Sequence, residues 1–206
     1  AKRARKGNSR EMKKVLITGA GSYIGTSFEH YLTEHYPGMY DVCTVDMRSD
    51  GWRNMAFRGY DVVFHVAGIA HIKETDENAE LYYKVNRDLT VECAKKALSE
   101  QVPHFVFLSS MSVYGMNSGR IIKETEPSPT TNYGKSKLEA ENDLNILANQ
   151  FPNTFTVAIL RPPMIYGKGC KGNYNALKKI ALSVPLFPDI INRRSMLYID
   201  NLCEFV

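Results

Sequence analysis

Short apolar runs alternate along the chain with longer amphipathic stretches. The apolar runs are VLIT (15–18), DVCTVD (41–46), DVVFHVAG (61–68), HFVFLSS (104–110) and TVAIL (156–160). Continuous apolar runs of this length, rich in Val, Ile and Phe, are typical of strands that are buried on both faces of a parallel sheet. We therefore predict five such strands.

Helical periodicity fills the gaps between these strands. It covers 22–36, 81–99, 132–149 and about 173–183, and IDNLCEFV (199–206) has the pattern of an opening helix. Pro37-Gly38 is a stop signal for the first of them. Strands that alternate with helices predict a doubly wound, Rossmann-type α/β fold, in which ligands bind at the carboxyl ends of the strands.

The same pattern divides the chain into three parts. Residues 1–12 are polar and basic, and we expect them to be disordered. Residues 13–166 hold the predicted nucleotide-binding domain. From residue 167 the sequence becomes rich in Gly, Pro and Asn with shorter elements. We predict a small, apparently truncated substrate-binding lobe at 167–206.

Charge adds little to this picture. The net charge of the 206-residue chain is +4, but residues 1–14 hold seven of its 26 basic residues and one of its 22 acidic residues. The remainder is slightly acidic, so we expect no nucleic-acid partner. No apolar run approaches the roughly 18 residues of a membrane span, and the basic start has no apolar segment behind it, so we expect neither membrane insertion nor a secretory signal.

Cysteine and histidine spacing argues against a metal centre. Cys43, Cys93, Cys170 and Cys203 are far apart in sequence, and the five histidines are scattered. No CxxC or related ligand spacing exists. We therefore predict no metal, and isolated thiols favour the reducing cytoplasm.

The first strand leads into a glycine-rich loop, TGAGSYIG (18–25). Glycines at such a strand–helix junction allow a sharp turn and let backbone N–H groups approach a pyrophosphate at the helix N-terminus. The spacing differs from G-x-G-x-x-G, because Ser22 stands where a middle glycine is common. A tight turn without a ligand is the alternative interpretation.

Asp46 ends the second strand, 21 residues after Gly25. An acid at this place can bind the hydroxyls of an adenosine ribose and repel a 2′-phosphate, which favours NAD and makes NADP less likely. Arg48 lies two residues further on and could instead meet a phosphate. Asp46 could also be a simple turn residue.

Tyr133 and Lys137 lie four residues apart at the start of a predicted helix, in TNYGKSK (131–137). Residues at this spacing share one helix face, and an ammonium group beside a phenol lowers the phenol's pKa. The pair alone fits a surface pair as well as a catalytic one. However, Ser109, Ser110 and Ser112 follow the fourth strand at the same sheet edge, where a hydroxyl could bind a substrate oxygen or simply cap a turn.

The motifs TGAGSYIG, HVAG, SSMSVYG, YGKSK and LRPPMIYGKG occur in this order. Together they resemble the extended short-chain dehydrogenase/reductase family, which contains NAD-dependent nucleotide-sugar epimerases and dehydratases. The resemblance covers about residues 15–202. It departs from the family at Ser22 and in length, because most of the substrate lobe is absent.

The resemblance implies a role for each matching residue. Ser110, Tyr133 and Lys137 would be catalytic, with Tyr133 as acid/base and Ser112 as a reserve for Ser110. The implied cofactor-binding residues are Gly19, Ser22, Tyr23, Ile24, Gly25, Asp46, Ala67, Gly68, Tyr133 and Lys137. The implied substrate-binding residues are Ser110, Asn173 and Arg194, with Asn175 nearby. Asn86 would support the active-site strands, and Arg161-Pro162-Pro163 would lie near the nicotinamide.

The resemblance further implies a nucleotide-sugar 4-epimerase that acts on a UDP-hexose or UDP-N-acetylhexosamine through a 4-keto intermediate. A second hypothesis is an NAD(P)H-dependent 4-keto reductase of a nucleotide deoxysugar in polysaccharide biosynthesis. A third is a dinucleotide-binding module without turnover. A dehydratase fits less well, because Met111-Ser112 replaces the acidic pair of dehydratases. Relatives often form homodimers, so a homodimer is expected.

Overall fold

A computed structural model describes residues 12–70, 72, 74–170, 173–183 and 193–206. Five parallel strands form its central sheet, in the order β2-β1-β3-β4-β5. Their bounds are β1 Lys13–Thr18, β2 Tyr40–Val45, β3 Val62–His65, β4 His104–Leu108 and β5 Thr156–Leu160. The order reverses between β1 and β3, which is where doubly wound sheets bind ligands. This confirms the predicted fold class.

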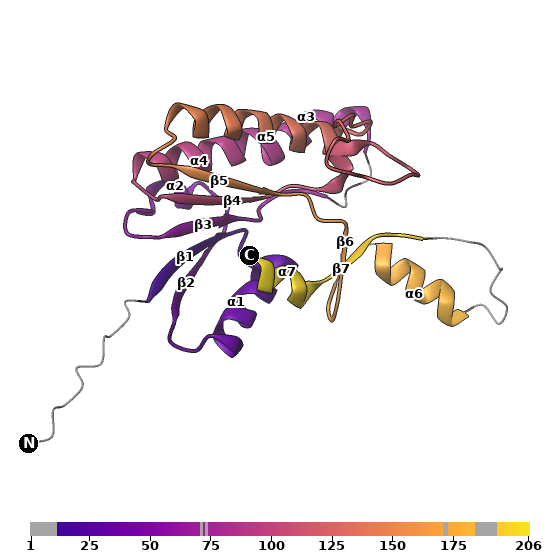
Figure 1. Cartoon of the computed structure of the whole chain (residues 1–206), viewed down its shortest axis with the longest axis horizontal. Coiled ribbons are helices and arrows are strands. Elements are labelled where there is room, and N and C mark those ends of the chain that lie inside the picture. The colour runs from indigo at the N-terminus through magenta and orange to yellow at the C-terminus, as the bar shows by residue number, and fades with distance from the viewer. Residues whose placement is uncertain (1–11, 71, 73, 171–172, 184–192) are drawn as a thin grey trace, which may run out of the picture.

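Helices cover both faces of the sheet (Figure 1). On one face lie α3 (Ala79–Tyr83), α4 (Leu89–Ser99) and α5 (Asn132–Gln150), with the short α2 (Gly51–Asn54). On the other lie α1 (Tyr23–His35) and α7 (Ile199–Phe205). Alternate strand residues point to opposite faces, so Leu16 and Val63 join the core under α4 and α5, whereas Ile17 joins the core under α1.

The predicted helix over 81–99 is one helical stretch with an interruption. It begins earlier, at Ala79, and contains a π-helical turn, Lys84–Asp88, between α3 and α4. Such turns insert one extra residue and are frequent at functional sites. The third strand is also shorter than predicted: β3 ends at His65, and residues 66–68 leave the sheet as a loop.

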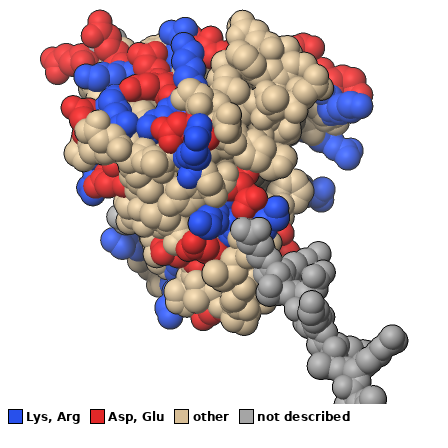
Figure 2. Space-filling model, turned by 90° about the vertical axis from the view of Figure 1, so that its left-hand side faces the viewer, with Lys and Arg blue, Asp and Glu red and all other residues tan. Residues whose placement is uncertain are grey.

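The segment after β5 contains elements that the apolar pattern did not reveal. Met164–Tyr166 (β6) and Met196–Tyr198 (β7) pair in parallel as a separate two-stranded sheet. The helix predicted at about 173–183 is confirmed as α6, Asn173–Ser183. Figure 1 shows α6 away from the central sheet. Charges of both signs are interspersed on the face in Figure 2.

The last helix returns to the central core. Ile199, Leu202 and Cys203 are each at most 4% exposed and pack with residues of β1 and α1, including Phe28. The division into 13–166 and 167–206 stays a prediction, and we propose that α7 belongs with the first part. Residues 1–11, which make up nearly all of the predicted tail, lie outside the described residues.

Candidate active site

A cavity of about 600 Å³ opens at the carboxyl edge of the sheet. This volume is within the usual range for small-molecule sites. Among the described residues of its wall, Lys137 is the one charged side chain. The wall consists of Gly21, Ser22, Tyr23, Ile24, Val66, Gly68, Ile69, Ala70, Leu108, Ser109, Ser110, Met111, Ser112, Tyr133, Lys137, Pro162, Pro163, Met164 and Ile165.

Ser22 caps the helix that follows the glycine loop. Its hydroxyl accepts a 3.1 Å hydrogen bond from the backbone N–H of Gly25, and its backbone is extended, as expected of an N-cap residue. A Cβ added at Gly25 would lie 2.8 Å from Ser22 Oγ and 3.2 Å from Ile17 Cγ2. The serine that departs from the common pattern therefore stabilises α1, and Gly25 lets α1 approach β1 closely.

Six of the predicted cofactor residues line the cavity, and four do not. Those in its wall are Ser22, Tyr23, Ile24, Gly68, Tyr133 and Lys137. Gly19 and Ala67 instead pack against each other, because a Cβ added at Gly19 would lie 3.1 Å from the Ala67 Cα. Gly25 and Asp46 are also outside the wall. Their roles at a cofactor remain predictions.

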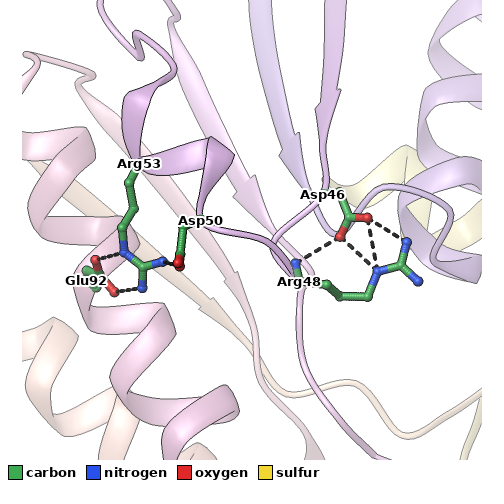
Figure 3. Close-up of polar contacts among 5 residues, drawn as sticks. All are labelled: Asp46, Arg48, Asp50, Arg53 and Glu92. Atoms are coloured by element: carbon green, nitrogen blue, oxygen red, sulfur yellow. Dashed lines mark hydrogen bonds and ion pairs between the residues drawn. The ribbon is translucent and has the colours of Figure 1, made fainter.

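Asp46 is already bound by Arg48 (Figure 3). The backbone N–H of Arg48 donates to Asp46 Oδ1 at 2.9 Å, and its Nε and Nη2 donate to the carboxylate at 2.9 and 2.6 Å. These bonds lower the pKa of Asp46 to about 2. A ribose at this carboxylate would have to share it with the guanidinium or displace it.

Tyr133 and Ser110 are neighbours in the cavity wall. Burial raises the pKa of the Tyr133 phenol, and a hydrogen-bond interaction with the Ser110 hydroxyl opposes that rise. The Ser110 hydroxyl also donates to Ser112 Oγ at 3.1 Å. The sequence predicted that Lys137 would lower the pKa of this phenol, but in the structure burial raises it, and the group that lowers it is Ser110 and not Lys137.

Lys137 is buried and is held at the end of β4. Its Nζ donates to the Leu108 carbonyl at 2.9 Å and lies 4.6 Å from the centroid of the Phe107 ring. Burial lowers the pKa of Lys137 to about 8, and Glu141 acts in the opposite direction. A Cβ added at Gly68 would be 3.3 Å from Nζ, so only glycine leaves this amine its present space.

The N-terminus of α5 is capped twice. Thr131 Oγ1 accepts from the N–H of Gly134 at 3.1 Å. The Glu74 carboxylate, from the segment after β3, accepts from the N–H groups of Asn132 and Tyr133, both at 3.0 Å. A carboxylate at this end also interacts favourably with the helix dipole. Glu74 thus fixes the backbone of Tyr133.

Asn86 lies in the π-helical turn and is completely buried. Its Oδ1 accepts from the Ile69 N–H at 2.9 Å, and its Nδ2 donates to the Ile69 carbonyl at 3.1 Å and to Ser136 Oγ at 3.2 Å. Ser136 in turn donates to the Tyr133 carbonyl at 2.9 Å. The Asn86 amide therefore connects a cavity loop to the helix that carries Tyr133 and Lys137.

A buried histidine lies behind this loop. His65 Nδ1 is 2.8 Å from Thr18 Oγ1, and its Nε2 is 3.0 Å from Thr90 Oγ1. Thr90 donates its own hydroxyl proton to the Asn86 carbonyl, so Nε2 must be the protonated ring nitrogen and Thr18 must donate to Nδ1. Burial lowers the pKa of His65 to about 3, which keeps the ring neutral.

Two residues after β5 that were predicted at or near the substrate, Asn175 and Arg194, are not part of the described cavity wall. Asn173 begins α6, and its side chain lies outside what the structure describes. The Asn175 Nδ2 donates to the Cys170 carbonyl, and Arg194 is exposed before β7. Pro162 and Pro163 do line the cavity, whereas the Arg161 side chain turns away to bind Glu141.

The described residues offer neither a metal centre nor a membrane-spanning helix. Nowhere in this part of the chain do three or more His, Cys, Asp or Glu side chains gather as a metal would require. Within the same residues, no helix has the length and apolarity needed to cross a membrane.

Comparison with known proteins identifies relatives over the whole described sheet. The family model "NAD dependent epimerase/dehydratase family" matches residues 15–206. A UDP-glucose 4-epimerase of Vibrio cholerae is 30% identical over 97% of this chain and 67% of its own length. An N-acetyl-alpha-D-glucosaminyl-diphospho-ditrans,octacis-undecaprenol 4-epimerase of Escherichia coli O157:H7 is 30% identical over 93% of this chain and 61% of its own. The chain thus spans about two thirds of these relatives.

Solved structures show the same fold at lower sequence identity. The UDP-glucuronic acid 4-epimerase of Bacillus cereus, solved with UDP-glucuronic acid and NAD, superposes with a TM-score of 0.75 at 22% identity, covering 92% of this chain and 70% of that one. The dTDP-glucose 4,6-dehydratase DesIV of Streptomyces venezuelae, solved with NAD and TYD, gives 0.75 at 21% identity, covering 93% and 70%.

Proposed function

Because the chain belongs to the NAD-dependent epimerase/dehydratase family, we propose that it is an NAD-dependent 4-epimerase of a UDP-linked hexose or N-acetylhexosamine. The main support for this proposal is that Ser110, Tyr133 and Lys137 line the same cavity as the glycine loop. The two relatives named as 4-epimerases, at 30% identity, support the choice of C4 chemistry.

The cavity fits a dinucleotide in its chemistry. Gly21 to Ile24 present the start of α1 to the cavity, and a helix N-terminus favours a pyrophosphate. Gly68 leaves room beside Lys137 for a cofactor ribose. When bound there, NAD would supply reversible hydride acceptance at C4 of the sugar.

The side chains of Tyr133, Ser110 and Lys137 carry out the proton transfer at the C4 hydroxyl. Tyr133, as phenolate, takes the proton of the C4 hydroxyl while the C4–H bond breaks, and gives it back when the 4-keto group is reduced. The Ser110 hydroxyl donates to the C4 oxygen and stabilises its charge. The ammonium of Lys137 supplies the positive charge that favours the phenolate, against the burial that raises the pKa of Tyr133.

The wall composition argues against dehydration. Elimination of water needs an acid near the sugar C5 and C6, and the described residues of the cavity wall include neither Asp nor Glu. Met111 and Ser112 occupy the corresponding turn after β4.

A 4-keto reductase is the second candidate, favoured by one observation. Arg48 places a guanidinium beside Asp46, where it suits the 2′-phosphate of NADPH. Such a reductase would receive fresh NADH or NADPH in each cycle. An epimerase regenerates NAD and can retain it, so identification of the nucleotide released by denaturing the purified protein separates the two.

The direct test is interconversion of UDP-glucose and UDP-galactose, and of their N-acetylated forms, followed by chromatography. We expect turnover by the wild type. Tyr133→Phe should lose at least about 100-fold in kcat while it binds NADH as before. Equal activity of the Phe variant would contradict the mechanism. Wild-type protein that converts none of the four sugars would contradict the proposed function.

We also propose a homodimer through α4 and α5. A groove of about 540 Å³ runs between these helices, and Ile146 on its α5 side is 57% exposed. Arg87, Glu92 and Asp143 surround it with charges of both signs. A dimeric mass by sedimentation, lost in Ile146→Asp, would support this assembly.

A cytoplasmic location stays a prediction.

A further inference from the structure

Glu141 is a buried carboxylate that takes no direct part in the proposed proton transfer. It lies on α5 and is 1% exposed. Arg161, at the end of β5, donates from Nε to both of its oxygens at 3.1 and 3.0 Å, and from Nη2 at 2.5 Å. The Ser109 hydroxyl, at the end of β4, also donates to its Oε1. Four donated hydrogen bonds thus satisfy this buried carboxylate, and those from the guanidinium are charge-assisted.

Arg161 is itself held in place. Its Nη1 donates to the Tyr114 hydroxyl at 2.8 Å, and its guanidinium lies 5.1 Å from the centroid of that ring. The arrangement ties the ends of β4 and β5 to the middle of α5. Ser109 directly precedes Ser110, so these contacts also hold the loop that carries Ser110, the proposed hydrogen-bond donor to the C4 oxygen.

The position of Glu141 on α5 relates it to the proposed catalytic pair. Tyr133, Lys137 and Glu141 follow one another at intervals of four residues, and such residues share a helix face. Lys137 is 4% exposed, so its ammonium form is costly to bury. Among the described residues, Glu141 is the charged side chain that favours this ammonium form.

The other groups around Lys137 do not replace Glu141. His65, from β3, is neutral because its pKa is lowered to about 3. Tyr133, one turn earlier on α5, is uncharged in this structure because burial raises its pKa. Arg161 is positive and pairs with Glu141, so its charge cannot favour the ammonium form of Lys137. The Leu108 carbonyl contributes a dipole but no charge.

We propose that Glu141 is a positioning residue that keeps Lys137 in its ammonium form beside Tyr133, and that Arg161 and Ser109 hold the carboxylate in place for this purpose. The link to catalysis rests on the proposed function, because only a phenolate base needs the neighbouring ammonium. Stability alone does not account for the buried ion pair, since apolar replacements of such pairs are often equally stable.

The test is a titration of Lys137 by NMR, with lysine isotope-labelled at Cε and Lys137→Met used to identify the signal. Wild-type Lys137 should titrate near pH 8. In Glu141→Gln, the midpoint should fall by about one pH unit, because a neutral amide no longer offsets burial. Glu139→Gln is the matched control: it removes the same charge from a partly exposed site on α5, where the side chain is 45% exposed, and should leave the midpoint unchanged.

Glu141→Gln removes the charged partner of Arg161 and leaves a buried positive charge with only Tyr114, which favours unfolding. The double variant Glu141→Gln, Arg161→Gln avoids this, because two neutral amides replace the ion pair. Its Lys137 midpoint should also fall, since Glu141 and not Arg161 acts on this amine. A midpoint at or above the wild-type value in the folded variants would overturn the proposal.

The titration needs no turnover, so it separates this inference from the proposed function. If the wild type epimerises UDP-galactose, Glu141→Gln should lose activity at alkaline pH first, with the alkaline limb of the kcat profile moved down by the shift seen in NMR. An alkaline limb that stays in place while the Lys137 midpoint moves would overturn the catalytic role. If the wild type converts no sugar, the proposed function fails, and the NMR shift still decides whether Glu141 sets the charge of Lys137.

Discussion

Lys137 donates a 2.9 Å hydrogen bond from Nζ to the backbone carbonyl of Leu108, the last residue of β4. This contact fixes the amine to the edge of the sheet, next to the loop that carries Ser110. The phenol of Tyr133 has Ser110 as its hydrogen-bonding neighbour instead. Lys137 and Tyr133 thus share one cavity wall but have different hydrogen-bond partners, and under the proposed function a change that moves the amine should alter catalysis.

Gly68→Ala tests the space around this amine. The new Cβ would lie 2.9 Å from Asn86 Oδ1 and 3.3 Å from Lys137 Nζ. We expect NADH affinity to fall about tenfold and stability to fall by about 1–3 kcal/mol, the usual cost of overpacking. Fluorescence titration and urea unfolding measure the two effects. Gly51→Ala, whose Cβ would meet its nearest neighbour at 3.7 Å, should change neither.

Arg48→Ala tests the cofactor preference at the end of β2. Removal of the guanidinium frees Asp46 for a ribose and removes a partner for a 2′-phosphate. The dissociation constant for NADPH should rise about tenfold, whereas that for NADH should stay the same or fall. Arg53→Ala is the control, because Arg53 binds Asp50 and Glu92 on neighbouring elements (Figure 3). Unchanged NADPH binding in Arg48→Ala would show that Arg48 has no part in the preference.

Glu74→Gln tests the carboxylate cap of α5. The amide keeps an acceptor for one N–H group but loses the charge that interacts with the helix dipole. We expect a loss of about 1 kcal/mol in the free energy of unfolding and a lower kcat, because the cap fixes the backbone of Tyr133. Glu77→Gln, an exposed glutamate in the neighbouring turn, should have no comparable effect on either quantity.

His65 should make the protein sensitive to acid. The folded-state pKa of about 3 lies below the ordinary value of 6.5, so between these pH values the unfolded chain binds one more proton. Stability from this group is fully present above pH 6.5 and should fall by about 1.4 kcal/mol for each pH unit towards 3. His65→Asn should remove this contribution to the slope, measured by urea unfolding at several pH values. The exposed His104→Gln should retain it.

The sequence predicted the sheet and its helices because buried parallel strands and amphipathic helices leave strong periodic patterns. Tyr133, Lys137 and Ser110 were also predictable, since their local motifs carry the chemistry. Ile69, which Asn86 binds through its backbone, was not, because a backbone contact between distant segments leaves no mark in composition. Glu141 could have been noticed from its spacing of four from Lys137, but its burial and its partner Arg161 depend on the tertiary fold.

Side-chain roles were hardest to predict where a side chain hydrogen-bonds to the backbone and not to a ligand. Ser22 looked like a departure from the glycine pattern, and it is the N-cap of α1. The paired strands β6 and β7 escaped prediction because each has only three residues, which is too short for a period to be recognised.

The packing of α7 on α1 has a consequence for how the protein is made. Ile199, Leu202 and Cys203 complete the apolar core that begins with Val15 and Ile17. The ribosome makes β1 and α1 long before α7, so the emerging polypeptide leaves one side of the β1–α1 unit exposed until α7 follows. Contacts so distant in sequence slow folding and lengthen the exposure of apolar surface. Chaperones therefore have the longest opportunity to bind at α1, until residue 203 has emerged.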